Sequence, residues 1–161
     1  MDVNDVAVGG QVTGLGLRAR MVAQGLFTGR RGGRHSLLIA DHEEGQRRAL
    51  SVLLRTEGHE THLAADDEEA VEIVHRERID VVILELELPR SGGIDLFRSI
   101  KSLARGPVAC VFTAEEPSPR AQMDALIEDA FTVVPKPIDD VVMKQVIESV
   151  IRRYFPWPNE G

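Results

Sequence analysis

Short apolar runs alternate with amphipathic stretches along residues 35–161, and this alternation restricts the possible folds more than any other feature of the sequence. Five runs have the length and the apolar or β-branched character of strands, at residues 36–40, 60–64, 80–84, 108–112 and 131–134. Five helical stretches separate or follow them, at residues 44–55, 66–76, 94–103, 119–128 and 139–154. Strands that alternate with helices predict an α/β fold, in which a doubly wound parallel sheet carries helices on both faces.

Local signals mark the ends and the buried faces of these helices. Three side chains suited to helix capping stand at predicted starts: Asp66, Ser118 and Asp139. In the last helix, four apolar residues at helical spacing are the candidates for the buried face: Val142, Val146, Ile147 and Val150.

The charge of the chain is divided unevenly between two parts. The 161 residues carry a net charge of −7, but residues 1–34 contain five arginines and two acids, so this part carries +3 and the rest −10. Eight of the 14 glycines also lie in residues 1–34. We therefore expect a flexible, basic, Gly/Arg-rich arm at 1–34, one domain at 35–154 and a short tail at 155–161. The single cysteine, Cys110, excludes an internal disulfide framework, and no apolar run is long enough to span a membrane.

Polar side chains stand at or just after four of the predicted strands. Parallel sheets carry their sites at the carboxyl ends of the strands, so these side chains are expected to converge. Carboxylates there would hold a divalent cation, while a lysine and a hydroxyl would hold a phosphoryl group. The residues concerned are Asp41, His42 and Glu43 after the first strand, Glu85 and Glu87 after the third, Thr113 after the fourth and Lys136 after the fifth.

Four motifs at these places resemble the receiver domain of two-component response regulators: LLIADHEE, DVVILELELPRSGGIDLFRSIK, VACVFTA and VVPKPID. The resemblance covers residues 35 to about 153 and implies a flavodoxin-like (βα)5 fold with strand order 2-1-3-4-5. It also implies signalling in a bacterial cytoplasm without an enzymatic activity of the chain's own. In this family the peptide bond that precedes the proline of the last motif is commonly cis, which makes Lys136–Pro137 the candidate.

The chain departs from the family pattern at the phosphorylation site. The position that matches the phospho-acceptor aspartate holds Glu85, and the second acid after the first strand is replaced by His42, whereas Asp41 keeps the first place. A glutamate places its carboxylate about one C–C bond farther out, and a displacement of about 1 Å can cost on the order of 100-fold in attack. Imidazole nitrogen is also a poor ligand for magnesium.

Of the remaining family positions, two match the family pattern and one departs from it. Thr113 and Lys136 match the family residues that contact the phosphoryl group, while Val133 stands where a switch aromatic is common. The longer side chain of Glu85 could reach the ammonium of Lys136 or the hydroxyl of Thr113, which would imitate part of the phosphorylated state. We therefore predict a degenerate receiver, a pseudo-receiver, with no cofactor and with magnesium binding by Asp41 and Glu87 weak or lost. A softer metal at Asp41, His42 and Glu85 is a weaker alternative, and another is that the acids are remnants without a role.

After the last helix only about seven residues remain, so the hypothesis is a stand-alone module whose output runs through protein contacts. The partner would be an effector or a sensor kinase. Helix 119–128, strand 131–134 and the last helix would form the docking or homodimer face. One alternative is a response regulator that is still weakly phosphorylated. The other is an arm that binds nucleic acid or an anionic surface through GRRGGR, although the acidic balance of the chain argues against nucleic acid.

Overall fold

The structure, a computed structural model, describes residues 34–156, so the predictions for the arm and for residues 157–161 of the tail fall outside the described residues. Within this range five strands alternate with five helices, as the sequence predicts. The strands are β1 (Ser36–Ala40), β2 (Glu60–Ala64), β3 (Val81–Glu85), β4 (Ala109–Ala114) and β5 (Thr132–Pro135). The helices are α2 (Glu44–Thr56), α3 (Asp67–Arg76), α4 (Gly92–Leu103), α5 (Pro119–Ile127) and α6 (Asp140–Tyr154).

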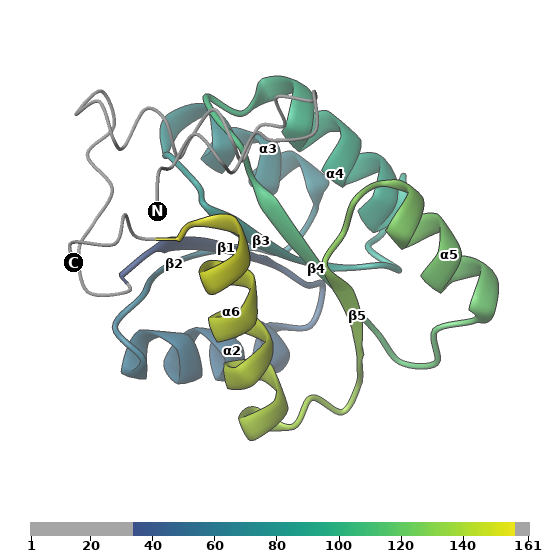
Figure 1. The fold of residues 1–161 in the computed structure, drawn as a ribbon. Coiled ribbons are helices and arrows are strands. Elements are labelled where there is room, and N and C mark those ends of the chain that lie inside the picture. Colours follow the sequence, from purple (N-terminus) through teal and green to yellow (C-terminus); the bar gives the residue numbers. More distant parts are fainter. Residues whose placement is uncertain (1–33, 157–161) are drawn as a thin grey trace, which may run out of the picture.

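All strand pairs are parallel, and the order in the sheet is β2-β1-β3-β4-β5, which confirms the predicted flavodoxin-like topology. Helices α2 and α6 cover one face of the sheet, and α3, α4 and α5 cover the other (Figure 1). No helix in residues 34–156 is both long and apolar enough to cross a membrane.

Successive side chains of each central strand enter opposite halves of the core, because strand side chains alternate between the two faces. In β1, Leu38 and Ala40 pack beneath α3, α4 and α5, whereas Leu37 and Ile39 pack beneath α2 and α6. Both faces are covered, which explains why β1, β3 and β4 read as continuous apolar runs.

Strand boundaries differ from the prediction by one or two residues. β3 begins at Val81, one residue later than predicted, and the carboxylate of the preceding Asp80 accepts a hydrogen bond of 3.0 Å from the backbone N–H of Ser36. β4 extends through Ala114, so Thr113 lies within the strand and pairs in register with Glu85. Glu85 is therefore the last residue of β3, and Thr113 is the last but one of β4.

The predicted helix caps form, but one predicted core residue is wrong. The side chains of Asp66, Ser118 and Asp139 each accept a hydrogen bond from a backbone N–H in the first turn of α3, α5 and α6. In α6, Val142 is 44% exposed, and the fully buried residue is Met143. Helical spacing allows either Val142 or Met143 to lie on the buried face of α6. Packing of this helix against the sheet buries Met143.

The loop after β3 passes very close to the end of that strand. Gly93 lies where an added Cβ would stand 2.4 Å from the carbonyl oxygen of Glu85 and 3.0 Å from Cα of Leu86. The Gly93 N–H donates to the Leu86 carbonyl at 2.9 Å. Only a residue without a side chain permits this approach, which fixes the backbone on either side of Glu85.

Replacing Gly93 with alanine should therefore destabilise the domain by about 1–3 kcal/mol, because backbone atoms on both sides would have to move. Urea denaturation measures the change. The matched control is Gly45→Ala in α2, where nothing lies within 4 Å of the added Cβ and a small gain is expected. Equal effects of the two substitutions would contradict the close-approach argument.

Candidate functional site

Four polar side chains meet at the carboxyl edge of the sheet: Asp41 and His42 after β1, Glu85 at the end of β3 and Lys136 after β5. Asp41 and Glu85 are buried, and the side chain of Lys136 is only 9% exposed. The His42 side chain is 57% exposed and forms the outer wall of the group. The sequence predicts that these four residues lie at one edge of the sheet, and the structure places them in direct contact.

The Lys136 ammonium lies between the two buried carboxylates. Its Nζ is 2.8 Å from Oδ2 of Asp41 and 3.1 Å from Oε2 of Glu85. Charges this deeply buried are stable only when they are paired, so the ammonium is what allows both acids to lie inside the protein.

His42 closes the other side of Glu85. Its Nδ1 is 2.6 Å from Oε1 of Glu85, and its backbone N–H donates to Oε2 at 3.3 Å. With Glu85 ionised, Nδ1 carries the proton and donates it to the carboxylate. Both carboxylate oxygens of Glu85 are thus engaged by groups of the protein itself.

The position of Asp41 is fixed by the start of α2. Its Oδ1 accepts a hydrogen bond of 2.8 Å from the Glu43 N–H, and the Arg47 guanidinium donates to the Asp41 carbonyl oxygen at 2.8 Å. Sequence reasoning missed Arg47, and the only signal for it is a helical spacing that places it one turn beyond Glu43.

The ionisable groups shift one another's pKa values in opposite directions. Burial raises the pKa of Glu85 above its ordinary value and Asp41 raises it further, against the effect of Lys136. Burial by itself would raise the pKa of Asp41. Hydrogen bonding with Glu85, Lys136 and the Glu43 amide outweighs this effect, and the pKa lies below its ordinary value. Burial by itself would lower the pKa of Lys136, but the carboxylates of Asp41 and Glu85 raise it above its ordinary value of 10.5.

These directions fix how each group contributes to stability. Asp41 stabilises the fold above its ordinary pKa, and this contribution is lost as the pH falls through its lower value in the folded state. Lys136 stabilises the fold below pH 10.5, and its contribution is lost as the pH rises through its higher value in the folded state. The effect of Glu85 on the pH dependence of stability is opposite to that of Asp41. Its pKa is raised in the folded state, so its ionisation destabilises the fold.

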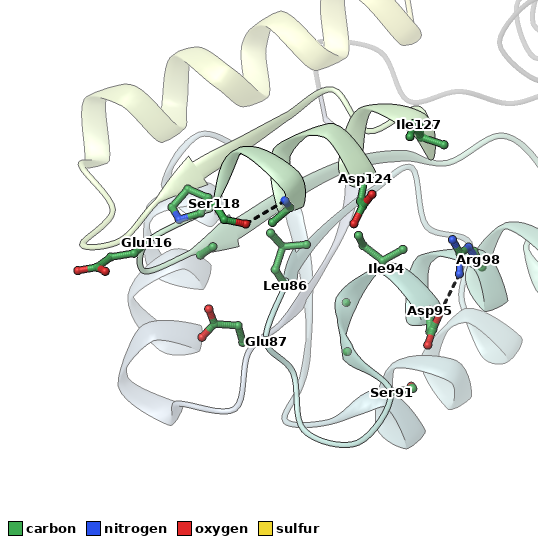
Figure 2. A pocket seen from close by; sticks show the side chains of 15 residues that line it. Leu86, Glu87, Ser91, Ile94, Asp95, Arg98, Glu116, Ser118, Asp124 and Ile127 are labelled. Carbon is green, nitrogen blue, oxygen red and sulfur yellow. Dashed lines mark hydrogen bonds and ion pairs between the residues drawn. The ribbon is translucent and has the colours of Figure 1, made fainter.

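The side chains of the other predicted site residues make no hydrogen bond or ion pair with this group within residues 34–156. The carbonyl of the buried Thr113 accepts from the Leu86 N–H at 2.8 Å, but no hydrogen bond among residues 34–156 joins its hydroxyl to Glu85. Val133 is half-buried and packs against the core beneath α3, α4 and α5. Glu87 is exposed and lines a groove between α4 and α5 (Figure 2), and the Glu43 side chain is exposed. The Lys136–Pro137 peptide bond is cis.

The donor set at this edge fits magnesium poorly. Asp41, His42 and Glu85 each offer one ligand atom, all within 4.8 Å of one another, and Glu87 is not part of this set. Magnesium takes oxygen ligands in octahedral geometry, whereas two carboxylates and an imidazole are donors that zinc accepts. The ammonium of Lys136 would repel either cation from the carboxylates it already pairs with.

Residues 37–148 match the response regulator receiver domain family. The transcriptional regulatory protein GlrR of Escherichia coli K12 is 27% identical over 124 residues, which cover 77% of this chain and 28% of GlrR. Response regulator RR06 of Streptococcus pneumoniae is 28% identical over 120 residues, 74% of this chain and 54% of that protein. Sporulation initiation phosphotransferase F of Bacillus subtilis is 28% identical over 124 residues, 74% of this chain and 93% of that protein. The chain therefore spans about half or less of the first two relatives.

Solved structures show the same fold. The CheX-CheY-BeF3-Mg+2 complex from Borrelia burgdorferi matches with a TM-score of 0.66 and 28% identity, over 73% of this chain and 89% of that chain. A two-component response regulator from Clostridium difficile matches with a TM-score of 0.68 and 22% identity, over 74% of this chain and 97% of that chain.

Replacing Lys136 with methionine should destabilise the protein by about 3–5 kcal/mol at neutral pH, because it leaves two buried carboxylates without a cation. The loss should shrink as the pH falls, because without the ammonium both buried carboxylates take up protons more readily and the protonated, neutral forms need no cation. Urea denaturation at a series of pH values measures both effects. In the control, Lys144→Met removes a half-exposed ion pair with Glu57 and should change stability little at any pH. A loss for Lys136→Met that does not depend on pH would contradict the pairing argument.

Proposed function

Because this chain belongs to the response regulator receiver family of two-component signalling proteins, we propose that it is a receiver-type module that signals without phosphorylation, through contacts with other proteins. In this role the chain is a binding module rather than an enzyme, and we place it in the cytoplasm. The observation that carries the proposal is that Glu85, at the phospho-acceptor position, has both carboxylate oxygens bound by His42 and Lys136.

Attack on a phosphoryl group needs a free carboxylate oxygen at the right place. At Glu85, Oε1 is 2.6 Å from the imidazole nitrogen and Oε2 is 3.1 Å from the ammonium, so either oxygen must give up a charge-assisted contact before it can attack. Burial also raises the pKa of Glu85 above its ordinary value, so the ionised, nucleophilic form is less favoured at this position than in water. The poor fit of the donor set to magnesium removes a third requirement.

The same contacts support a module held in one state. The Glu85–Lys136 ion pair resembles the contact that a phosphoryl group would make with this lysine, but Glu85 offers one charge and two oxygens where a phosphoryl group offers nearly two charges and three. Val133 provides no aromatic ring that could reorient between two states. Imitation of the phosphorylated state is therefore partial and permanent.

Incubation with acetyl phosphate and magnesium should leave the chain unmodified, as read by intact-protein mass spectrometry. The double substitution Glu85→Asp with His42→Asp should raise phosphorylation steeply, because it restores the shorter nucleophile and an oxygen ligand for the metal. The matched control is Glu85→Ala with His42→Asp, which should stay unmodified.

Stoichiometric acyl phosphate on Glu85 of the unaltered chain would falsify the proposal. Slow labelling of the unaltered chain, lost on Glu85→Ala, would instead support the alternative of a weakly phosphorylated response regulator. The comparison with the double variant separates this outcome from labelling at another residue.

For the output surface we propose the face made by α5, β5 and α6. Five apolar side chains on its two helices are exposed by 44% or more: Met123, Leu126, Ile127, Val141 and Val142. A groove between α5 and β5, lined by residues that include Leu126, Phe131 and Val133, adds apolar surface to it. Apolar side chains gathered on one face favour a protein partner or a second copy of the chain. The similar CheY of Borrelia burgdorferi, crystallised with CheX, supports a protein partner.

Substituting Leu126 with glutamate should weaken self-association, measured by sedimentation velocity over a range of protein concentrations, because it places a charge in the apolar face. Val52→Glu on α2 is the control, since Val52 is 66% exposed and lies outside this face. An equal effect of both substitutions, or a chain that stays monomeric at the highest attainable concentration, contradicts the homodimer face.

A further inference from the structure

A groove of about 500 Å³ runs between α4 and α5, beside the loop that follows Glu85. Figure 2 shows Asp124 of α5 facing Ile94 of α4 across this groove, with Glu87 beside Leu86 at one end. Its walls combine apolar and acidic side chains. Four carboxylates line it, from Glu87, Asp95, Glu116 and Asp124, against a single guanidinium, that of Arg98.

Three of these four carboxylates lack a cationic partner within residues 34–156. Asp95 pairs with Arg98 at 2.9 Å, but no ion pair among these residues involves Glu87, Glu116 or Asp124. Neighbouring surface acids do find partners, because Asp67 contacts Arg90 and Glu128 contacts both Arg98 and Lys101. The groove therefore holds negative charge that the described domain does not balance.

We propose that the basic segment of the chain's own amino-terminal region, residues 17–31, binds in this groove. The segment contains four of the five arginines of the arm and no acidic residue, and it also contains five larger apolar residues: Leu17, Met21, Val22, Leu26 and Phe27. Arginines suit the unpaired carboxylates, and the apolar side chains suit Leu86, Ile94 and Ile127 of the walls.

The other grooves of the described domain fit this segment less well. The groove between α5 and β5 has no charged lining residue, so it offers nothing to the arginines. The groove between α2 and α6 is lined by two acids and two bases, Glu57, Glu148, Lys144 and Arg152, so its charge is already balanced. Only the groove between α4 and α5, among these three, matches both the charge and the apolar character of the segment.

The segment is long enough to reach the groove from the place where it joins the domain. Residues 17–33 precede Arg34, and 17 residues in extended form span about 56 Å. A domain of this size is about 35 Å across. Arg34 stands two residues before β1, at the amino ends of the strands, whereas the groove lies at their carboxyl ends. Within one molecule the groove is therefore within reach of the leading part of the segment, which holds Arg18 and Arg20. Arg30 and Arg31 are only three or four residues from Arg34 and reach the groove of a second copy instead.

The test uses the full chain with one spin label in the segment. Ala19→Cys, between Arg18 and Arg20, provides the attachment site, because the only native cysteine, Cys110, is buried and does not compete for the label. Paramagnetic broadening of backbone amide signals should be concentrated on residues 86–95 and 114–127. It should fall with added salt, since the contact is partly ionic.

A triple variant that removes the unpaired charges should lose this broadening: Glu87→Gln, Glu116→Gln and Asp124→Asn. A charge-matched control should keep it: Glu72→Gln, Asp140→Asn and Glu148→Gln, three exposed acids outside the groove. Mixing labelled chain with isotope-enriched, unlabelled chain tells binding within one molecule from binding between copies, and either supports the proposal. Broadening spread evenly over the domain, unchanged in the triple variant, or replaced by tight binding of the segment to an RNA oligonucleotide overturns it.

Discussion

The Lys136 ammonium between two buried carboxylates is the interaction on which the rest of the site depends. Lysine 136 follows the edge strand β5, and it reaches Glu85 and Asp41 across the end of β4, where Thr113 and Ala114 are small enough to leave room. Its own backbone N–H is held by the Ala114 carbonyl at 2.7 Å. Three separate chain segments are tied together by one charge, which is why burial of two acids does not open the sheet edge.

The two unusual residues of the site make sense only as a pair. Glu85 has the extra methylene that carries Oε1 to within 2.6 Å of His42. An aspartate at 85 would withdraw the carboxylate from the imidazole, and an aspartate at 42 would face Glu85 with a second negative charge. Glu85 and His42 therefore fit each other, and replacing only one of them with aspartate would lose their contact. The result is a carboxylate whose two oxygens are both bound inside the protein.

Much of the fold and the make-up of the site could be predicted from the sequence, because both follow from short-range patterns and from parallel topology. Apolar runs located the strands, and parallel order brought Asp41, Glu85 and Lys136 to one edge. What the sequence could not supply depends on side-chain direction. The bond from His42 to Glu85 and the contact of Arg47 with the Asp41 carbonyl need the exact path of the chain. The choice of Met143 over Val142 needs the rotation of α6, which the sheet decides.

The negative charge of the domain is arranged in two unlike ways on either side of one loop. At the strand ends, Asp41 and Glu85 are paired with Lys136, so a new ligand for either carboxylate would have to break a buried ion pair. Beyond Leu86, whose backbone bonds Thr113 on one side and Gly93 on the other, the carboxylates of Glu87 and Asp124 remain unbalanced by residues 34–156. A binding event there requires no internal contact to break. Under the function that we propose, the groove is therefore the part of the carboxyl edge at which a ligand meets charges that no internal contact already holds.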